Sequence, residues 1–123
     1  MSSTLQNTAR VLVVEDDEAL GELFAQVLAE RGHDVALATD VPSAVKLLRA
    51  REFDVIVTDL RLPGASGLEL LAWVQAQELQ LRVVVASAFA TTELTHHARR
   101  LGAREVLSKP IEPEALVAAV EAA

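Results

Sequence analysis

The chain has 123 residues, a formal net charge of −7, 51% hydrophobic but only 3% aromatic residues, and no cysteine. This length suits one domain with an aliphatic core and excludes two. The absence of cysteine excludes disulfides and thiolate metal sites and fits a reducing compartment, so we expect a cytoplasmic protein. The acidic charge argues against nucleic-acid binding by this chain, and no apolar stretch is as long as a membrane span.

Residues 1–9 form a polar start to the chain. They lack the basic beginning and apolar middle of a signal peptide, so we expect a short flexible lead-in. No linker or low-complexity stretch interrupts the rest. The sequence therefore predicts a single domain over residues 10–123.

Five short apolar runs alternate with five segments of helical period. In chain order, the apolar runs are 11–14, 35–37, 55–57, 83–86 and 106–107. The helical segments carry their apolar residues at 20–28, 41–48, 70–74, 94–101 and 116–120. Strand-then-helix alternation predicts an α/β fold with a parallel sheet covered by helices on both faces. The unbroken apolar runs indicate strands that are buried on both sides.

The first helical segment has the fullest apolar stripe. Five side chains are expected to face the core, namely Leu20, Leu23, Phe24, Val27 and Leu28. Gly32 stands where a left-handed residue usually ends a helix, and Gly102 has the same place after the fourth segment. Trp73, in the third segment, lies at core spacing, and we expect it to pack there.

Four of the five apolar runs lead into polar residues that strand packing does not require. Glu15 and Asp16 follow the first run, Asp59 the third, Ser87 the fourth and Lys109 the fifth. The carboxyl ends of parallel strands share one edge of the sheet, where open α/β sheets bind ligands, so we expect these side chains to converge. Taken singly, each has an ordinary explanation as a helix cap, a turn, a strand end or a solvated lysine.

Together these side chains predict phosphoryl chemistry. Carboxylates brought close repel one another unless a cation lies among them, and oxygen ligands without His or Cys suit Mg²⁺, with Mn²⁺ as a substitute. A metal, an ammonium and a hydroxyl are what a transferring phosphoryl group needs. A carboxylate can accept that group as a mixed anhydride. Asp59 is the expected acceptor because it stands alone at the end of a central run.

Four motifs follow one another along the chain: Val13-Val14-Glu15-Asp16-Asp17, Val57-Thr58-Asp59-Leu60-Arg61-Leu62-Pro63-Gly64, Val85-Ala86-Ser87-Ala88 and Leu107-Ser108-Lys109-Pro110. In this order they resemble the receiver domain of two-component response regulators. The resemblance covers roughly residues 10 to 121. It implies a flavodoxin-like (βα)5 fold with strand order 2-1-3-4-5 and a cis peptide bond before Pro110. By analogy it allows a dimer through the fourth and fifth helices.

The resemblance implies a role for each site residue. Asp59 would receive phosphate from a sensor histidine kinase or a phosphotransfer protein, in a phosphorelay. Ser87 and Lys109 would contact the phosphoryl group. Mg²⁺ would be held by three carboxylates and one backbone carbonyl, those of Glu15, Asp16, Asp59 and Arg61. Such a domain is no enzyme on an external substrate; it acts through protein contacts on a downstream effector or output domain.

One position departs from the family pattern. Receiver domains often carry Tyr or Phe three residues before the motif lysine, and that ring swings inward as the Ser or Thr hydroxyl moves toward the phosphate. Here the residue is Val106, which has no ring and a stiff χ1. We therefore expect a muted or differently routed switch, carried by the loop after Ser87.

Four further residues need an interpretation. Arg61 and Phe89 each lie two residues past a site residue, at positions that resemble those that tune dephosphorylation in the family. The resemblance implies that they would limit water access and lengthen the lifetime of the phosphoryl group. The ordinary alternative is a solvated arginine and a packed phenylalanine. His96 and His97 are adjacent on a helical segment and point in different directions, so a metal site is not expected there.

Other functions stay open on the sequence alone. The runner-up is a receiver-like interaction module that works without phosphorylation, which the missing aromatic ring allows. A phosphatase with an aspartate nucleophile would need an Asp-x-Asp motif, and Arg61 takes the second position. Nucleotide binding is poorly supported, because neither glycine-rich phosphate loop occurs and the first strand–helix turn is acidic.

Overall fold

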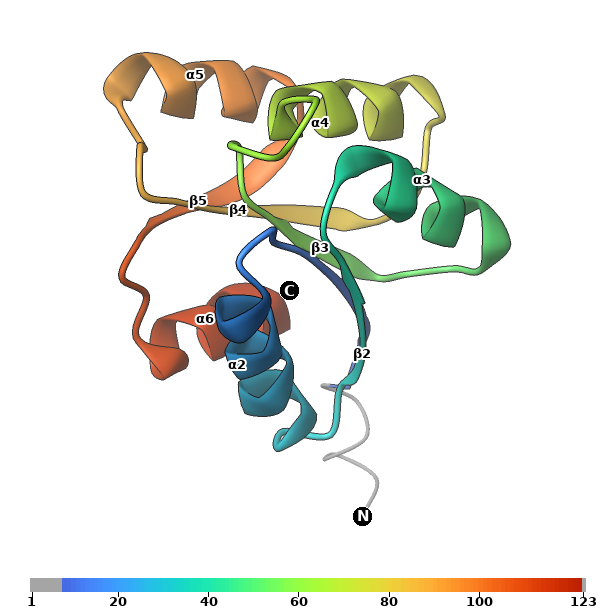
Figure 1. Ribbon diagram of the computed structural model, residues 1–123, viewed down its shortest axis with the longest axis vertical. Helices are drawn as coiled ribbons and strands as arrows, with labels where there is room; N and C mark the ends of the chain where they lie inside the picture. Colours follow the sequence, from blue (N-terminus) through green and yellow to red (C-terminus); the bar gives the residue numbers. More distant parts are fainter. Residues whose placement is uncertain (1–7, 123) are drawn as a thin grey trace.

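Five parallel strands form one sheet between two layers of helices (Figure 1). The computed structural model describes residues 8–122, so most of the expected lead-in lies outside the described residues. The strands are β1 (Arg10–Val14), β2 (Asp34–Ala38), β3 (Val55–Thr58), β4 (Arg82–Ser87) and β5 (Ala103–Ser108). The helices are α2 (Glu18–Ala29), α3 (Val41–Ala50), α4 (Gly67–Ala76), α5 (Thr92–Arg100) and α6 (Pro113–Glu121). The strand order β2-β1-β3-β4-β5 confirms the predicted topology.

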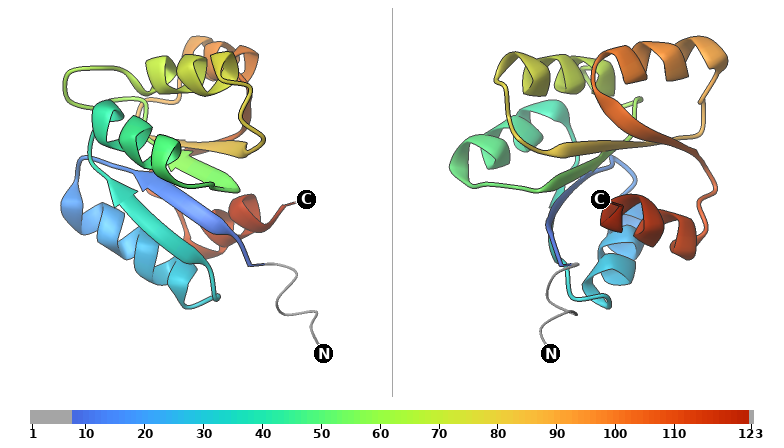
Figure 2. Two further views of the ribbon diagram at one scale, coloured as in Figure 1. Left: turned by 90° about the vertical axis from the view of Figure 1, so that its right-hand side faces the viewer. Right: turned by 180° about the vertical axis from the view of Figure 1, so that it is seen from behind.

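The two faces of the sheet carry different helices. Helices α2 and α6 lie together on one face, and α3, α4 and α5 cover the other (Figures 1 and 2). Successive side chains of a strand point to opposite faces. Val11 and Val13 of β1 therefore pack with α2 and α6, whereas Leu12 and Val14 pack with the three-helix layer. This continuous burial explains why β1 consists of aliphatic residues only, after Arg10.

Side-chain caps fix the start of four helices. Asp17, Asp40, Ser66 and Thr91 each accept a hydrogen bond from a backbone N–H in the first turn of the helix that follows. These bonds satisfy donors that the helix itself leaves free. At the other end, Gly32 and Gly102 have φ angles of 92° and 102°, as their places after the helices predict.

Two expectations about burial are wrong. The central strands β1, β3 and β4 are buried almost throughout, but β2 and β5 are partly exposed because they lie at the edges of the sheet. Leu37 of β2 is 42% exposed. Leu23 of α2 is 52% exposed, because the helix buries a narrower stripe that includes Phe24 and Leu28. Trp73 does pack against the core, as expected.

The described helices include none that is both long and apolar enough to cross a bilayer.

Candidate functional site

The backbone ladder of the sheet places the site residues. Glu15, Asp59 and Lys109 each come directly after a strand, and the N–H of each donates to a carbonyl of a neighbouring strand at 2.9 to 3.1 Å. The ladder thus continues one residue past the strand ends. This fixes three polar residues, distant in sequence, on the same edge of the sheet.

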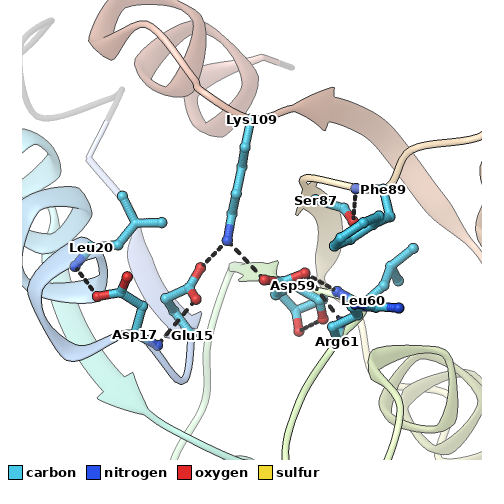
Figure 3. Close-up of polar contacts among 10 residues, drawn as sticks. Glu15, Asp17, Leu20, Asp59, Leu60, Arg61, Ser87, Phe89 and Lys109 are labelled. Carbon is cyan, nitrogen blue, oxygen red and sulfur yellow. Dashed lines mark hydrogen bonds and ion pairs between the residues drawn. The ribbon is translucent and has the colours of Figure 1, made fainter.

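Lys109 joins two of the acids directly. Its Nζ donates to Glu15 Oε1 at 2.6 Å and to Asp59 Oδ2 at 2.8 Å (Figure 3). Glu15 is 4% exposed and Asp59 is 7% exposed, so both carboxylates depend on this ammonium for compensation. The expected convergence of acids and lysine is therefore present in the structure.

Asp59 is held through both of its carboxylate oxygens. Oδ1 accepts the backbone N–H of Leu60 at 2.6 Å and that of Arg61 at 3.2 Å, while Oδ2 faces Lys109. Hydrogen bonds of this kind fix the orientation of a carboxylate before any ligand arrives. One oxygen is thus anchored to the backbone and the other lies beside a mobile positive charge.

Burial and charge act against each other at Glu15 and Lys109. Burial raises the pKa of the Glu15 carboxyl above its ordinary value, and the bonds from Lys109 and the Asp17 N–H offset only part of this effect. Burial lowers the pKa of the Lys109 ammonium, but the bonds to Asp59 and Glu15 outweigh it, and the net pKa is raised. Lys109 is therefore charged at neutral pH.

The donor set fits a small hard cation. Carboxylate oxygens of Glu15, Asp16 and Asp59 all lie within 4.8 Å of one another, and Asp16 is the exposed member. Divalent cations with oxygen ligands, Mg²⁺ in particular, suit such a set. Arg61, whose backbone carbonyl is the expected further ligand, donates its backbone N–H to Asp59 Oδ1 at 3.2 Å.

The structure does not join Ser87 to Asp59 by a hydrogen bond. Ser87 ends β4 and is fully buried, and its Oγ accepts the backbone N–H of Phe89 at 3.0 Å. The carbonyl of Ser87 accepts the N–H of Lys109. Ser87 is thus placed at the site edge, with its hydroxyl engaged by the following loop.

Arg61 and Phe89 contact each other. The Arg61 guanidinium lies 4.0 Å from the centroid of the Phe89 ring, in a cation–π arrangement (Figure 3). Phe89 is 48% exposed. The ring of Phe89 thus lies on the surface, outside the hydrophobic core, and its partner is an arginine from another loop.

Two residues that support Asp59 escaped the sequence analysis. The buried Thr58 hydroxyl donates to the Asp59 carbonyl oxygen at 2.9 Å. Gly67 begins α4 so close to this peptide that a Cβ there would lie 2.9 Å from Leu60 Cα and closer still to the Asp59 carbonyl. In the sequence Gly67 reads as an ordinary turn glycine before the helix, so the close approach could not be predicted from the sequence.

The other singled-out residues lie apart from the carboxylates. Val106 of β5 is partly buried and packs against the core beneath α3, α4 and α5. His96 and His97 are exposed on α5, and the acidic cluster is the one group of potential metal ligands among residues 8–122. The Lys109–Pro110 peptide bond is cis, as the resemblance implied.

Comparison with known families identifies the domain. The model of the response regulator receiver domain matches residues 11–121, nearly the whole chain. The chain belongs to the response regulator receiver domain family. It is 34% identical over 116 residues to the alginate biosynthesis transcriptional regulatory protein AlgB of Pseudomonas aeruginosa, a match that covers 94% of this chain and 26% of AlgB. It is 36% identical to the transcriptional regulatory protein FixJ of Azorhizobium caulinodans, over 91% of this chain and 53% of FixJ.

The receiver domain spans about a quarter of AlgB and about half of FixJ. Among solved structures, the non-phosphorylated HemR receiver domain from Leptospira biflexa superposes with a TM-score of 0.85 at 33% identity, and 91% of this chain and 90% of that one are covered. A response regulator from Burkholderia pseudomallei, solved with a phosphorylated aspartic acid, calcium ion and citrate, has a TM-score of 0.86 at 32% identity, with 92% and 66% covered.

Proposed function

We propose that this receiver domain is a cytoplasmic signalling switch that is phosphorylated on Asp59. One observation carries the proposal. The Asp59 carboxylate is held by two backbone N–H groups, faces the Lys109 ammonium and shares a cluster with Glu15 and Asp16. A nucleophilic carboxylate, a compensating cation and further oxygen ligands in one place suit phosphoryl transfer better than any other reaction class.

The transfer step uses a carboxylate oxygen of Asp59 as nucleophile. This oxygen attacks the phosphorus of a phosphohistidine, the O–P bond forms as the N–P bond breaks, and the imidazole nitrogen keeps the electron pair and takes a proton from solvent. The product is an aspartyl phosphate, a mixed anhydride. Hydrolysis returns Asp59 to its unphosphorylated state. Water attacks the phosphorus, the acyl O–P bond breaks, and carboxylate, phosphate and a proton result.

The neighbours of Asp59 supply charge and hydrogen bonds for this step. Lys109 neutralises negative charge on the phosphoryl group, and Ser87 donates its hydroxyl to a phosphoryl oxygen. Glu15, Asp16 and Asp59, with the backbone carbonyl of Arg61, would hold Mg²⁺, or Mn²⁺ in its place. When bound, the cation neutralises charge that develops as the phosphoryl group is transferred.

A solved neighbour supports the assignment of an aspartate as acceptor. The response regulator from Burkholderia pseudomallei carries a phosphorylated aspartic acid together with a calcium ion. At 32% identity over 92% of this chain, the two share the family and the fold. The acidic cluster of this chain would likewise suit an aspartate acceptor together with a divalent cation.

The partners follow from the chemistry. The phosphoryl donor would be a sensor histidine kinase or a phosphotransfer protein, since an acyl phosphate forms readily from a phosphohistidine. The receiver of the signal would be an effector protein or an output domain, which transcriptional regulators such as AlgB and FixJ make plausible as a class. Contact with that effector would occur through the surface that changes on phosphorylation.

Intact mass after incubation with acetyl phosphate and Mg²⁺ tests the proposal. We expect the chain to gain one phosphoryl group, and the gain to disappear in Asp59→Asn and in the absence of Mg²⁺. Asp34→Asn, an exposed aspartate at the start of β2, is the matched control and retains the gain. A phosphoryl group that persists in Asp59→Asn would refute Asp59 as acceptor. No gain at all would favour the module that works without phosphorylation.

A further inference from the structure

Two routes of contact lead from Asp59 and its neighbour Ser87 to one exposed ring. The backbone N–H of Arg61 donates to Asp59 Oδ1 at 3.2 Å, and the guanidinium of the same residue covers the Phe89 ring at 4.0 Å. From the other side, the N–H of Phe89 donates to Ser87 Oγ at 3.0 Å. Asp59, Arg61, Phe89 and Ser87 thus surround the place where the phosphoryl group would be attached (Figure 3).

Phe89 differs from the other phenylalanines of the chain. Phe24 and Phe53 are each 4% exposed and belong to the core, whereas Phe89 is 48% exposed. Core packing therefore does not account for the position of its ring. The contact of the ring, with Arg61, and the hydrogen bond of the Phe89 N–H, to Ser87, both involve residues at the proposed phosphorylation site, while the Phe89 carbonyl accepts the N–H of Thr91 at 2.8 Å.

Phosphorylation of Asp59 would compete for both contacts. It adds close to two negative charges and three strong acceptor oxygens. The Arg61 guanidinium is a planar fork of donors that suits phosphate oxygens, and a charge-assisted hydrogen bond to phosphate is stronger than a cation–π contact at an exposed site. The Ser87 hydroxyl would also move toward the phosphoryl group. The Phe89 N–H, which donates to Ser87 Oγ, must then either move with this oxygen or lose the hydrogen bond.

We propose that Phe89 is the ring that reports phosphorylation in this receiver domain. Arg61 leaves the ring for the phosphoryl group, and the ring moves with the β4–α5 loop to a second position. The inference rests on the proposed phosphorylation of Asp59. The missing ring at Val106 predicts a switch that is carried by the loop after Ser87. Movement of the Phe89 ring would be the physical basis of that switch.

The same movement would reshape a neighbouring surface. Arg61 and Leu94 lie on the wall of an open hollow of about 750 Å³, which is otherwise lined by Asp16, Glu69 and residues 60–66 of the β3–α4 loop. When the guanidinium turns toward Asp59, the part of the lining that Arg61 forms changes shape. The surface that depends on phosphorylation therefore includes the β3–α4 loop and the start of α5, on the three-helix side of the sheet.

Fluorine NMR of the protein labelled with 4-fluorophenylalanine tests the inference. The chain has three phenylalanines, so three resonances are expected, and Phe89→Leu assigns the exposed one. Addition of acetyl phosphate and Mg²⁺ should shift the Phe89 resonance and leave those of Phe24 and Phe53 unchanged. Intact mass on the same sample measures the phosphorylated fraction, so the two proposals can fail separately.

The variant Arg61→Ala distinguishes two causes of a shift in the Phe89 resonance. In the first the ring moves because Arg61 releases it, and in the second its resonance changes only because the phosphoryl charge is near. In Arg61→Ala, the Phe89 resonance should already be displaced before phosphorylation, and most of the further shift on phosphorylation should be lost. Arg51→Ala is the matched control, because Arg51 lies over Phe53 at 4.7 Å in the same kind of contact. That variant should move the Phe53 resonance and preserve the full response of Phe89.

Each outcome decides between the proposals. A Phe89 resonance that stays in place while mass spectrometry finds Asp59 phosphorylated would overturn the role of the ring and leave the proposed function intact. A full phosphorylation shift that survives in Arg61→Ala would also overturn it. Failure of Asp59 to become phosphorylated would remove the proposed function and the role of Phe89 together.

Discussion

Lys109 Nζ lies 2.8 Å from Asp59 Oδ2 and also contacts Glu15, so one ammonium compensates two buried carboxylates. The exposed Asp16 adds a third carboxylate, which lies within 4.8 Å of these two. A divalent cation held by these carboxylates would take over part of the charge compensation that Lys109 provides. The lysine therefore stabilises the metal-free site and, at the same time, competes with the cation for it.

Replacement of this lysine should make the domain depend on Mg²⁺. Lys109→Gln leaves Glu15 and Asp59 buried without a cation, and we expect the free energy of unfolding to fall on the order of 2–3 kcal/mol. Added Mg²⁺ should restore much of this loss, and the gain should exceed that of the unaltered protein, because no ammonium competes for the acids. Urea unfolding with Mg²⁺ and with a chelator measures both quantities.

Lys46→Gln is the control for this experiment. Lys46 is the other lysine of the chain and is exposed on α3, so its removal changes the net charge equally without touching the site. It should change stability by less than about 0.5 kcal/mol, with an ordinary response to Mg²⁺. An equal Mg²⁺ response in Lys109→Gln and Lys46→Gln would mean that the lysine does not compete with the cation.

Gly67 should tolerate no side chain. A methyl group in Gly67→Ala would collide with the Asp59 carbonyl and with Leu60 Cα, which are backbone atoms that cannot rotate away. We expect a loss of about 1–3 kcal/mol in unfolding free energy and slower phosphorylation, because the Asp59 peptide must shift. In the control Gly21→Ala, a Cβ would meet only ordinary contacts at 3.6 Å or more. Equal stability of the two variants would contradict the close approach.

Sequence patterns predicted the parallel sheet and the acidic cluster for one physical reason, whereas the strand order was implied by the resemblance of the four motifs to receiver domains. Buried parallel strands need continuous apolar runs, and polar residues that interrupt them at the carboxyl end are confined to one edge of the sheet. The place of Glu15, Asp59 and Lys109 at this edge can therefore be predicted without knowledge of how the helices pack. The contacts among them depend on the backbone hydrogen bonds that continue the sheet past the strand ends, and the register of those bonds is not contained in the apolar pattern.

What the sequence did not predict depends on geometry between separate segments. The exposure of Leu23 and Leu37 follows from how narrow a stripe α2 buries and from the edge position of β2, neither of which periodicity contains. The stack of Arg61 on Phe89 joins two loops that are distant in sequence. Nothing in their local sequence predicts that the two side chains meet, although both had been singled out by position.

The Arg61 side chain should also affect how long the phosphoryl group survives. Its guanidinium lies against the Phe89 ring at the rim of the site, and once it turns to the phosphoryl group it would limit the approach of water to the phosphorus. We expect Arg61→Ala to speed hydrolysis of the aspartyl phosphate by up to about tenfold, equivalent to ~1.4 kcal/mol of barrier. Loss of the phosphoryl group is followed by intact mass over time, with Arg51→Ala as the control. An unchanged rate in Arg61→Ala would exclude Arg61 from this role.

A second ionic cluster ties α6 to the other end of the sheet and should be sensitive to pH. Glu121 accepts two hydrogen bonds from Arg31 at 3.0 and 3.2 Å, and its Oε2 lies 2.9 Å from Nε2 of the buried His33. His33 Nδ1 accepts the N–H of Ala9 at 2.9 Å, so in neutral His33 the proton is on Nε2 and is donated to Glu121. Arg31 first, and His33 second, hold the pKa of the Glu121 carboxyl below its ordinary 4.5, although burial acts the other way.

A lowered pKa in the folded state means that Glu121 stabilises the fold above pH 4.5 and that this contribution is lost as the pH falls through the folded-state pKa. At pH 7 we expect Glu121→Gln to lose about 1–2 kcal/mol of unfolding free energy, since part of the cluster is exposed. The difference from the unaltered protein should shrink steadily below pH 4.5, because the carboxyl then becomes neutral like the amide. Glu114→Gln removes the same charge from an exposed position in the first turn of the same helix and should cost only the helix-dipole contribution there, about 0.3–1 kcal/mol. If chemical unfolding across this pH range gave a constant deficit for Glu121→Gln, the contribution would come from packing and not from the charge.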